Sequence, residues 1–183
     1  MKKLLAIDGN SILNRAYYGI RPLTTKDGIF TNAVYGLVNT VTSNMGYVKP
    51  DFCAVAFDLK APTFRHLKYE GYKATRKGMP EELAMQLPYA KEVLSAMGLH
   101  VLECQGYEAD DILGTLARIC DESEDVEGYI LTGDRDSLQL ISDRVKVLLV
   151  KNSGVEVYDR ERFISEYGTT PDRLVDIKAL MGD

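Results

Sequence analysis

Acidic residues are concentrated in the stretch Gly106-Tyr107-Glu108-Ala109-Asp110-Asp111, directly before an apolar helical pattern. On a helix, Glu108 and Asp111 share a face, and Asp110 lies about 100° of rotation from Asp111. Taken alone, the stretch fits a charged first turn, where each acid gains roughly 0.3–1 kcal/mol from unpaired N–H groups. A chemical role requires that other carboxylates reach the same place.

Three further acids follow predicted strands. Residues 2–8 form an apolar run that ends in Asp8, residues 52–57 are followed by Asp58, and residues 129–132 are followed by Gly133 and Asp134. The carboxyl ends of parallel strands meet at one edge of a sheet, where open α/β sheets bind ligands. With Asp136, the sequence places six or seven carboxylates around one cleft. Asp8 and Asp136 are equally well explained as helix caps, Asp136 for a turn over residues 137–141.

Carboxylates that crowd together repel one another unless a cation offsets their charge. Oxygen ligands favour Mg²⁺ or Mn²⁺, and no Cys/His grouping points to zinc. Many acids without a Ser/Cys–His nucleophile set favour metal-assisted hydrolysis of a phosphate ester, in which two ions about 3.5–4 Å apart act together. The sequence therefore predicts a hydrolase with two divalent cations.

A basic stretch supplies a surface for a polyanion. Six Lys or Arg residues and one acid, Glu70, occur between residues 60 and 78, although the net charge of the chain is −5. Aromatic residues alternate with these cations, a combination typical of single-stranded nucleic acid binding. A solvated loop is the alternative, but solvated surfaces usually mix both signs. The cations are Lys60, Arg65, Lys68, Lys73, Arg76 and Lys77.

Predicted strands alternate with predicted helices along the 183 residues, which indicates one α/β domain around a mainly parallel sheet flanked by helices. No apolar run approaches the ~20 residues of a membrane span, and the three cysteines lack CxxC spacing, so a cytoplasmic location is expected. The predicted helices are 12–18, 31–47, 81–97, 108–120, 159–167 and one from Thr170 onward. The remaining strands are 100–103, 146–150 and 155–158, the last two as a hairpin at an edge of the sheet.

The combined motifs resemble the 5′-nuclease (flap endonuclease) family, and most closely the N-terminal 5′→3′ exonuclease domain of bacterial DNA polymerase I. They span nearly the whole chain as LLAIDGNSILNRAYYG, AVAFDLKAPTFRHLKYEGYKATRKGMPEEL, GYEADDILGTLA, LTGDRDSLQLI and IKALMGD. The resemblance implies a PIN-like (resolvase-like) fold and metal-dependent cleavage of DNA with a free 5′ end or 5′ flap during replication and repair. An RNA primer on DNA is a further possible substrate.

The resemblance also implies roles for particular residues. Asp8, Asp58, Glu108 and Asp110 match positions that serve mainly the first ion, Asp111 and Asp134 lie between the ions, and Asp136 and Asp183 serve the second. Asp8, Asp110, Asp134, Lys73 and Arg76 are the expected catalytic residues. The arm at residues 60–82 matches the family's helical arch, so the expected substrate-binding residues are Arg15, Arg65, Tyr72, Lys73 and Arg76.

One departure from the family pattern leaves an alternative function open. In the family, the final GD is followed by another metal-binding Asp and a helix-turn-helix segment that grips duplex DNA, whereas this sequence ends at Asp183. A continuation into a polymerase is therefore expected. The alternatives are a non-catalytic nucleic-acid-binding module and, less favoured, a phosphatase-like domain with Asp8 as nucleophile.

Overall fold

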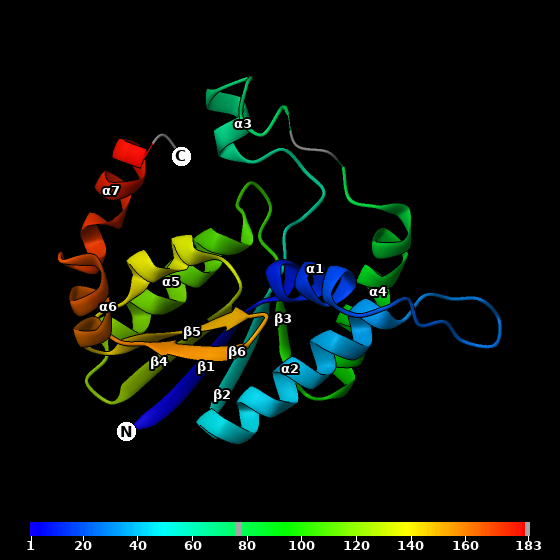
Figure 1. The fold of residues 1–183 in the computed structure, drawn as a ribbon, viewed down its shortest axis with the longest axis horizontal. Coiled ribbons are helices and arrows are strands. Elements are labelled where there is room, and N and C mark those ends of the chain that lie inside the picture. Colours follow the sequence, from blue (N-terminus) through cyan, green and yellow to red (C-terminus); the bar gives the residue numbers. More distant parts are fainter. Residues whose placement is uncertain (76–77, 182–183) are drawn as a thin grey trace.

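A computed structural model describes residues 1–75 and 78–181, which form one six-stranded sheet with helices on both faces (Figure 1). The strands are β1 (Lys2–Asp8), β2 (Phe52–Ala56), β3 (His100–Leu102), β4 (Val126–Thr132), β5 (Val145–Lys151) and β6 (Gly154–Tyr158). The α-helices are α1 (Gly9–Gly19), α2 (Asn32–Val48), α3 (Phe64–Lys68), α4 (Glu81–Ala96), α5 (Ala109–Glu122), α6 (Arg160–Tyr167) and α7 (Leu174–Met181). Two 3₁₀ turns are η1 (Arg135–Leu140) and η2 (Pro171–Arg173).

The strand order is β3-β2-β1-β4-β5-β6, with only β6 antiparallel to its neighbour among the described strands. From β1 the chain builds outward through β2 and β3, and then returns to place β4 and β5 on the other side. The switch point of this doubly wound sheet therefore lies between β1 and β4, where ligands bind in such folds.

The central strands bury both faces, which explains their nearly continuous apolar runs. Alternate side chains divide between two hydrophobic cores of the described residues: Leu5 and Ile7 pack with α1, α2 and α4, whereas Ala6 and Ile130 pack with α5 and α6. Figure 1 shows these two groups of helices on opposite faces of the sheet. The sheet is consequently a rigid support for whatever projects from its carboxyl edge.

Most predicted elements are confirmed within one to three residues, including the edge hairpin β5–β6. One expectation was wrong. The cap of the turn after β4 is Asp134 and not Asp136, because the Asp134 carboxylate accepts the Asp136 N–H at 2.9 Å. A short helix, α3, forms within the basic stretch. No helix among residues 1–75 and 78–181 is long and apolar enough to cross a membrane.

Two glycines permit close packing beside the acids. A Cβ atom on Gly9 would lie 2.4 Å from the Phe57 ring, and a Cβ atom on Gly133 would lie 2.3 Å from Cδ of Arg15. Gly9 directly follows Asp8, and Gly133 directly precedes Asp134. The absence of side chains at these positions allows β1, β2 and β4 to bring their acids together.

The Gly9 contact predicts a difference between two glycine substitutions. Gly9→Ala is expected to lower the free energy of unfolding by about 1–3 kcal/mol, because Phe57 sits in a packed core and must shift. Gly46→Ala, on the exposed side of α2 with nothing within 4 Å of the new Cβ, is expected to raise it by roughly 0.5–1 kcal/mol. Urea unfolding of both variants checks this, and equal effects would contradict the packing argument.

Candidate active site

Five acids from four segments line a cleft of about 360 Å³ at the carboxyl edge of the sheet, among the described residues. Lys73 from the arm and Asn10, Ser11 and Asn14 from α1 complete much of its wall. The structure thus brings together acids that are up to 126 positions apart in the chain, at the β1/β4 switch point. These acids are Asp8, Asp58, Glu108, Asp110 and Asp134.

Asp8 is the most buried strand-end acid of this cleft, with 4% of its surface exposed. One carboxylate oxygen accepts the Ser11 N–H at 2.9 Å and caps α1, and the other accepts the Thr132 hydroxyl at 2.8 Å. Burial raises the pKa of Asp8 to about 6, and the charges of Asp110 and Asp134 add to this rise. Buried and with both oxygens engaged, Asp8 is poorly placed as a phosphatase nucleophile.

Thr132 is a site residue that the sequence interpretation missed. It is fully buried, and its hydroxyl donates to Asp8 and accepts the Asp134 N–H at 3.0 Å. One side chain therefore fixes the relative positions of two acids across the switch point. Its position two residues before Asp134, at the end of a predicted strand, was the available signal.

Asp58 is held at the N-terminus of α5. Its Oδ1 atom accepts the Ala109 N–H at 2.6 Å, and its backbone N–H donates to Asn10 Oδ1 at 3.1 Å. The Asn10 amide also donates to Asp58 Oδ2 at 3.4 Å. An anion at a helix N-terminus is stabilised by unpaired N–H groups, which explains how this acid is tolerated beside others.

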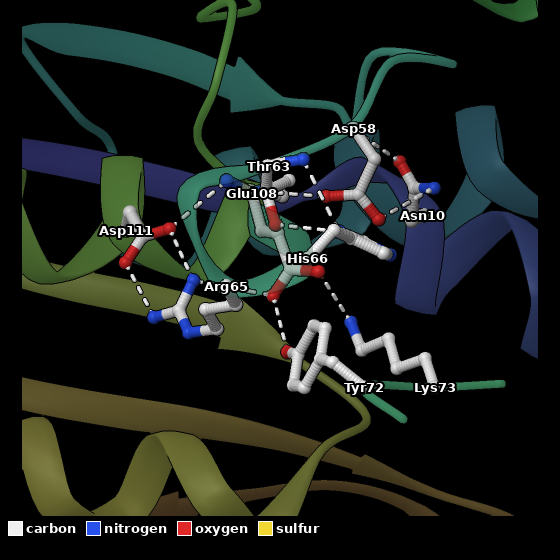
Figure 2. Close-up of polar contacts among 10 residues, drawn as sticks. Asn10, Asp58, Thr63, Arg65, His66, Tyr72, Lys73, Glu108 and Asp111 are labelled. Carbon is white, nitrogen blue, oxygen red and sulfur yellow. Dashed lines mark hydrogen bonds and ion pairs between the residues drawn. The ribbon is translucent and has the colours of Figure 1, made fainter. Parts of the chain in front are cut away.

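Glu108 is bound by the basic arm (Figure 2). Its Oε1 atom accepts Lys73 Nζ at 2.7 Å, and its Oε2 atom accepts the Tyr72 hydroxyl at 2.8 Å and the Arg65 guanidinium at 3.3 Å. Burial alone would raise the pKa of Glu108, but the hydrogen bonds from Lys73 and Tyr72 outweigh it and lower the pKa. The arm therefore supplies the counter-charge for the most enclosed acid of α5.

Asp111 does not line this cleft. Arg65 donates to both of its oxygens, at 2.7 and 2.8 Å, and holds the pKa of Asp111 below its usual range. Figure 2 shows this pair on the opposite side of Glu108 from Asp58. Asp111 instead borders a separate apolar hollow with Tyr107 and Ile112. Successive residues of a helix are rotated by about 100°, so Asp110 and Asp111 point to different surfaces.

Asp110 and Asp134 present exposed carboxylates to the cleft. Asp110 makes no hydrogen bond through its side chain within residues 1–75 and 78–181, and desolvation followed by the charges of Asp134 and Asp58 raises its pKa. Asp134 uses Oδ1 to cap η1. These two acids are therefore the ones most open to an added cation.

Asp136 and Arg15 lie outside the cleft. Asp136 pairs with Lys178 of α7 and borders a second hollow between η1 and α7. Arg15 donates to Asn152 Oδ1 at 2.9 Å and lines a groove between α1, α2 and the β5–β6 hairpin. Asn14 lines both that groove and the acidic cleft. The predicted residues Arg76 and Asp183 lie outside the described residues.

The donor set of the cleft fits a hard divalent cation in its chemistry. Its donors are carboxylate oxygens, and burial followed by the charges of neighbouring acids raises the pKa of Asp8 and of Asp110, charges that a cation would offset. Within residues 1–75 and 78–181, however, no three acidic, His or Cys side chains lie close enough together to hold one ion. An ion would thus be bound partly through water, as Mg²⁺ commonly is, or after side-chain movement.

Residues 3–168 match the family model described as the 5′-3′ exonuclease, N-terminal resolvase-like domain. The chain belongs to this family. It is 44% identical over 184 residues to a thermostable DNA polymerase I of Thermus filiformis, and 42% identical over 185 residues to DNA polymerase I of Caldicellulosiruptor bescii. The chain spans 21% and 22% of the lengths of these two relatives, which is about a fifth of each.

Solved structures of low identity share the fold of this exonuclease-family domain. The T5 D15 protein, co-crystallised with metal ions, superimposes with a TM-score of 0.70 at 19% identity, covering 100% of this chain and 66% of that one. The catalytic core of Rad2 in complex with DNA gives a TM-score of 0.58 at 18% identity, covering 100% of this chain and 55% of that one. The expected resolvase-like α/β fold and family are confirmed.

The raised pKa of Asp8 predicts a pH-dependent stability. Because the folded state takes up this proton near pH 6 and the unfolded chain near 3.8, the ionised carboxylate destabilises the fold, and stability falls as pH rises through this window. The full effect is about 3 kcal/mol. With a chelator present, Asp8→Asn is therefore expected to be more stable than the wild type above pH ~6 and to lose that advantage near pH ~4.

Urea unfolding across this pH range provides the measurement. Asp143→Asn, at an acid whose side chain is 84% exposed and outside the cleft, is the control. A difference in the free energy of unfolding between Asp8→Asn and the wild type that does not change with pH would contradict the conclusion that burial disfavours ionised Asp8.

Proposed function

We propose that this chain is the catalytic domain of a metal-dependent 5′→3′ exonuclease and 5′-flap endonuclease, working as the N-terminal part of a DNA polymerase I in primer and flap removal. The observation that carries the proposal is the cleft in which five carboxylates from β1, β2, β4 and α5 face Lys73 of the basic arm. Family membership and the 39–44% identity to DNA polymerase I chains support the same activity.

The acids would hold divalent cations, Mg²⁺ or Mn²⁺, and two of them. Asp110 and Asp134 are the open donors, with Asp8, Asp58 and Glu108 beside them. Asp111, Asp136 and Asp183 complete the proposed set, as the family pattern implies. Bound cations supply Lewis acidity toward the phosphodiester and offset the charge of the acids. The crystallisation of the T5 D15 protein with metal ions supports a metal requirement.

The arm would position and neutralise the substrate. Lys73 lines the cleft, so its ammonium group is placed to contact a phosphate bound beside the acids. Tyr72 offers an aromatic ring next to it, with Lys73 Nζ 5.2 Å from the ring centroid. Arg65 adds a cation on the arm, and Arg76 belongs to the proposed set as the family pattern implies. Arg15 lines the groove that shares Asn14 with the cleft.

Removal of one open carboxylate tests the chemistry. Asp134→Asn is expected to reduce Mg²⁺-dependent cleavage of a labelled 5′-flap DNA by roughly 10²–10³-fold or more while flap binding persists. The Asp143→Asn variant serves as the control. Undiminished cleavage by Asp134→Asn would remove the proposed role, and wild-type protein that binds the flap without forming product would favour a non-catalytic binding module.

The arm residues are tested through the salt dependence of binding. Arg65→Ala with Lys73→Ala is expected to reduce the slope of log K against log salt by roughly 0.7 for each single-strand phosphate that the arm no longer neutralises. Arg118→Ala removes a cation whose side chain is 71% exposed and which pairs with Glu122 on α5, away from the arm, so the slope should stay at the wild-type value. An unchanged slope in the double variant would count against the arm as the phosphate-binding surface.

A further inference from the structure

The arm and the first turn of α5 are joined by a compact set of polar contacts (Figure 2). Lys73 and Tyr72 bind Glu108 at 2.7 and 2.8 Å, and Arg65 binds Asp111 through two hydrogen bonds. The same three arm residues were assigned above to the DNA. Each of the three therefore binds a carboxylate at the start of α5.

The backbone at Lys73 indicates that these contacts hold the arm in place. Lys73 has φ of 55°, in the left-handed region, which is unfavourable for a residue with a side chain unless its surroundings stabilise it. Its ion pair with Glu108 is the strongest stabilising contact that the structure gives this residue. Loss of the ion pair would therefore favour a different conformation of the arm at this position.

Both carboxylate oxygens of Glu108 already accept hydrogen bonds from the arm. Its Oε1 atom is taken by Lys73, and its Oε2 atom by Tyr72 and Arg65. A divalent cation that binds a Glu108 oxygen directly competes with these donors, and a DNA phosphate that binds Lys73 competes with Glu108 for its ammonium group. Cations compete for Glu108 and DNA phosphates compete for Lys73, so both ligands act on the contact between these two residues.

We propose that the arm residues Lys73 and Arg65 are exchangeable counter-ions of the acidic site, and Tyr72 an exchangeable hydrogen-bond donor to it, all three released toward DNA when divalent cations bind the acids. The inference rests on the proposed function, because it specifies how that site is regulated. Each ligand removes a partner that the other must otherwise displace, so cation and DNA binding strengthen each other. The arm is withheld from DNA until the site is loaded with metal.

Tryptic digestion without DNA measures this release. Trypsin cleaves after Lys73 only when the Lys73 side chain is free to enter the protease, and the ion pair with Glu108 prevents this. Lys68 provides the internal reference, because it is exposed and packs on the Phe64 ring without an acidic partner in the described structure. Mg²⁺ is expected to raise the ratio of cleavage after Lys73 to cleavage after Lys68 by about fivefold or more. An unchanged or lowered ratio overturns the exchange.

Two variants separate the exchange from a general charge effect. Glu108→Gln removes the ionic partner, so the cleavage ratio should be high without Mg²⁺ and rise no further when it is added. Glu103→Gln breaks a comparable pair, Lys91–Glu103 at 2.6 Å on α4 and the loop after β3, and should leave the ratio at the wild-type value. A low metal-free ratio in Glu108→Gln contradicts the proposal.

A neutral substitution supplies an independent readout. Tyr72→Phe removes one hydrogen bond to Glu108 without changing charge, so Mn²⁺ measured by calorimetry in the absence of DNA is expected to bind about threefold tighter or more. Unchanged or weaker Mn²⁺ binding overturns the exchange. Flap cleavage tests the nuclease proposal separately. A protein that cleaves the flap but whose arm does not respond to metal would keep the proposed function and contradict only the exchange.

Discussion

Five carboxylates converge at the carboxyl edge of the sheet, and each must remain stable in a partly desolvated cleft where its neighbours have the same charge. The structure offsets this repulsion by three means. Asp58 binds a helix N-terminus, Asp8 accepts a backbone N–H and a buried hydroxyl, and Glu108 binds cationic and phenolic groups of the arm. Only Asp110 and Asp134 remain open, which makes them the natural positions for an added cation.

This distribution depends on the rigidity of the fold beneath it. Asp8 ends β1 and Asp134 follows β4, two neighbouring strands that pair in parallel register, and Thr132 links the two acids through one buried hydroxyl. The cores on the two faces of the sheet fix β1 and β4, so these acids cannot separate to reduce their repulsion. The raised pKa of Asp8 is the consequence: packing holds the carboxylate in a position that electrostatics alone would disfavour.

The sequence predicted the strand-end acids well because their positions follow from topology. A parallel sheet places the residues after β1, β2 and β4 at one edge whatever their side chains, so Asp8, Asp58 and Asp134 could be grouped in advance. Asp111 and Asp136 could not be placed in this way. Their directions depend on the rotation of α5 and on which acid caps η1, and local capping geometry decides both. Residue spacing in the sequence gives no direct measure of either.

The contacts of the arm were also not predictable from residue spacing. Its cations and aromatic rings were evident from residues 60–78, and they predicted a polyanion partner. Their present partners were not evident, because Lys73 meets Glu108 across 35 positions and Arg65 meets Asp111 across 46. Asp110 and Asp111 point to different surfaces. The first turn of α5 therefore lines the cleft through Asp110 and binds the arm through Asp111 and the preceding Glu108. The position of the arm is therefore tied to the charge of the cleft through a single helical turn.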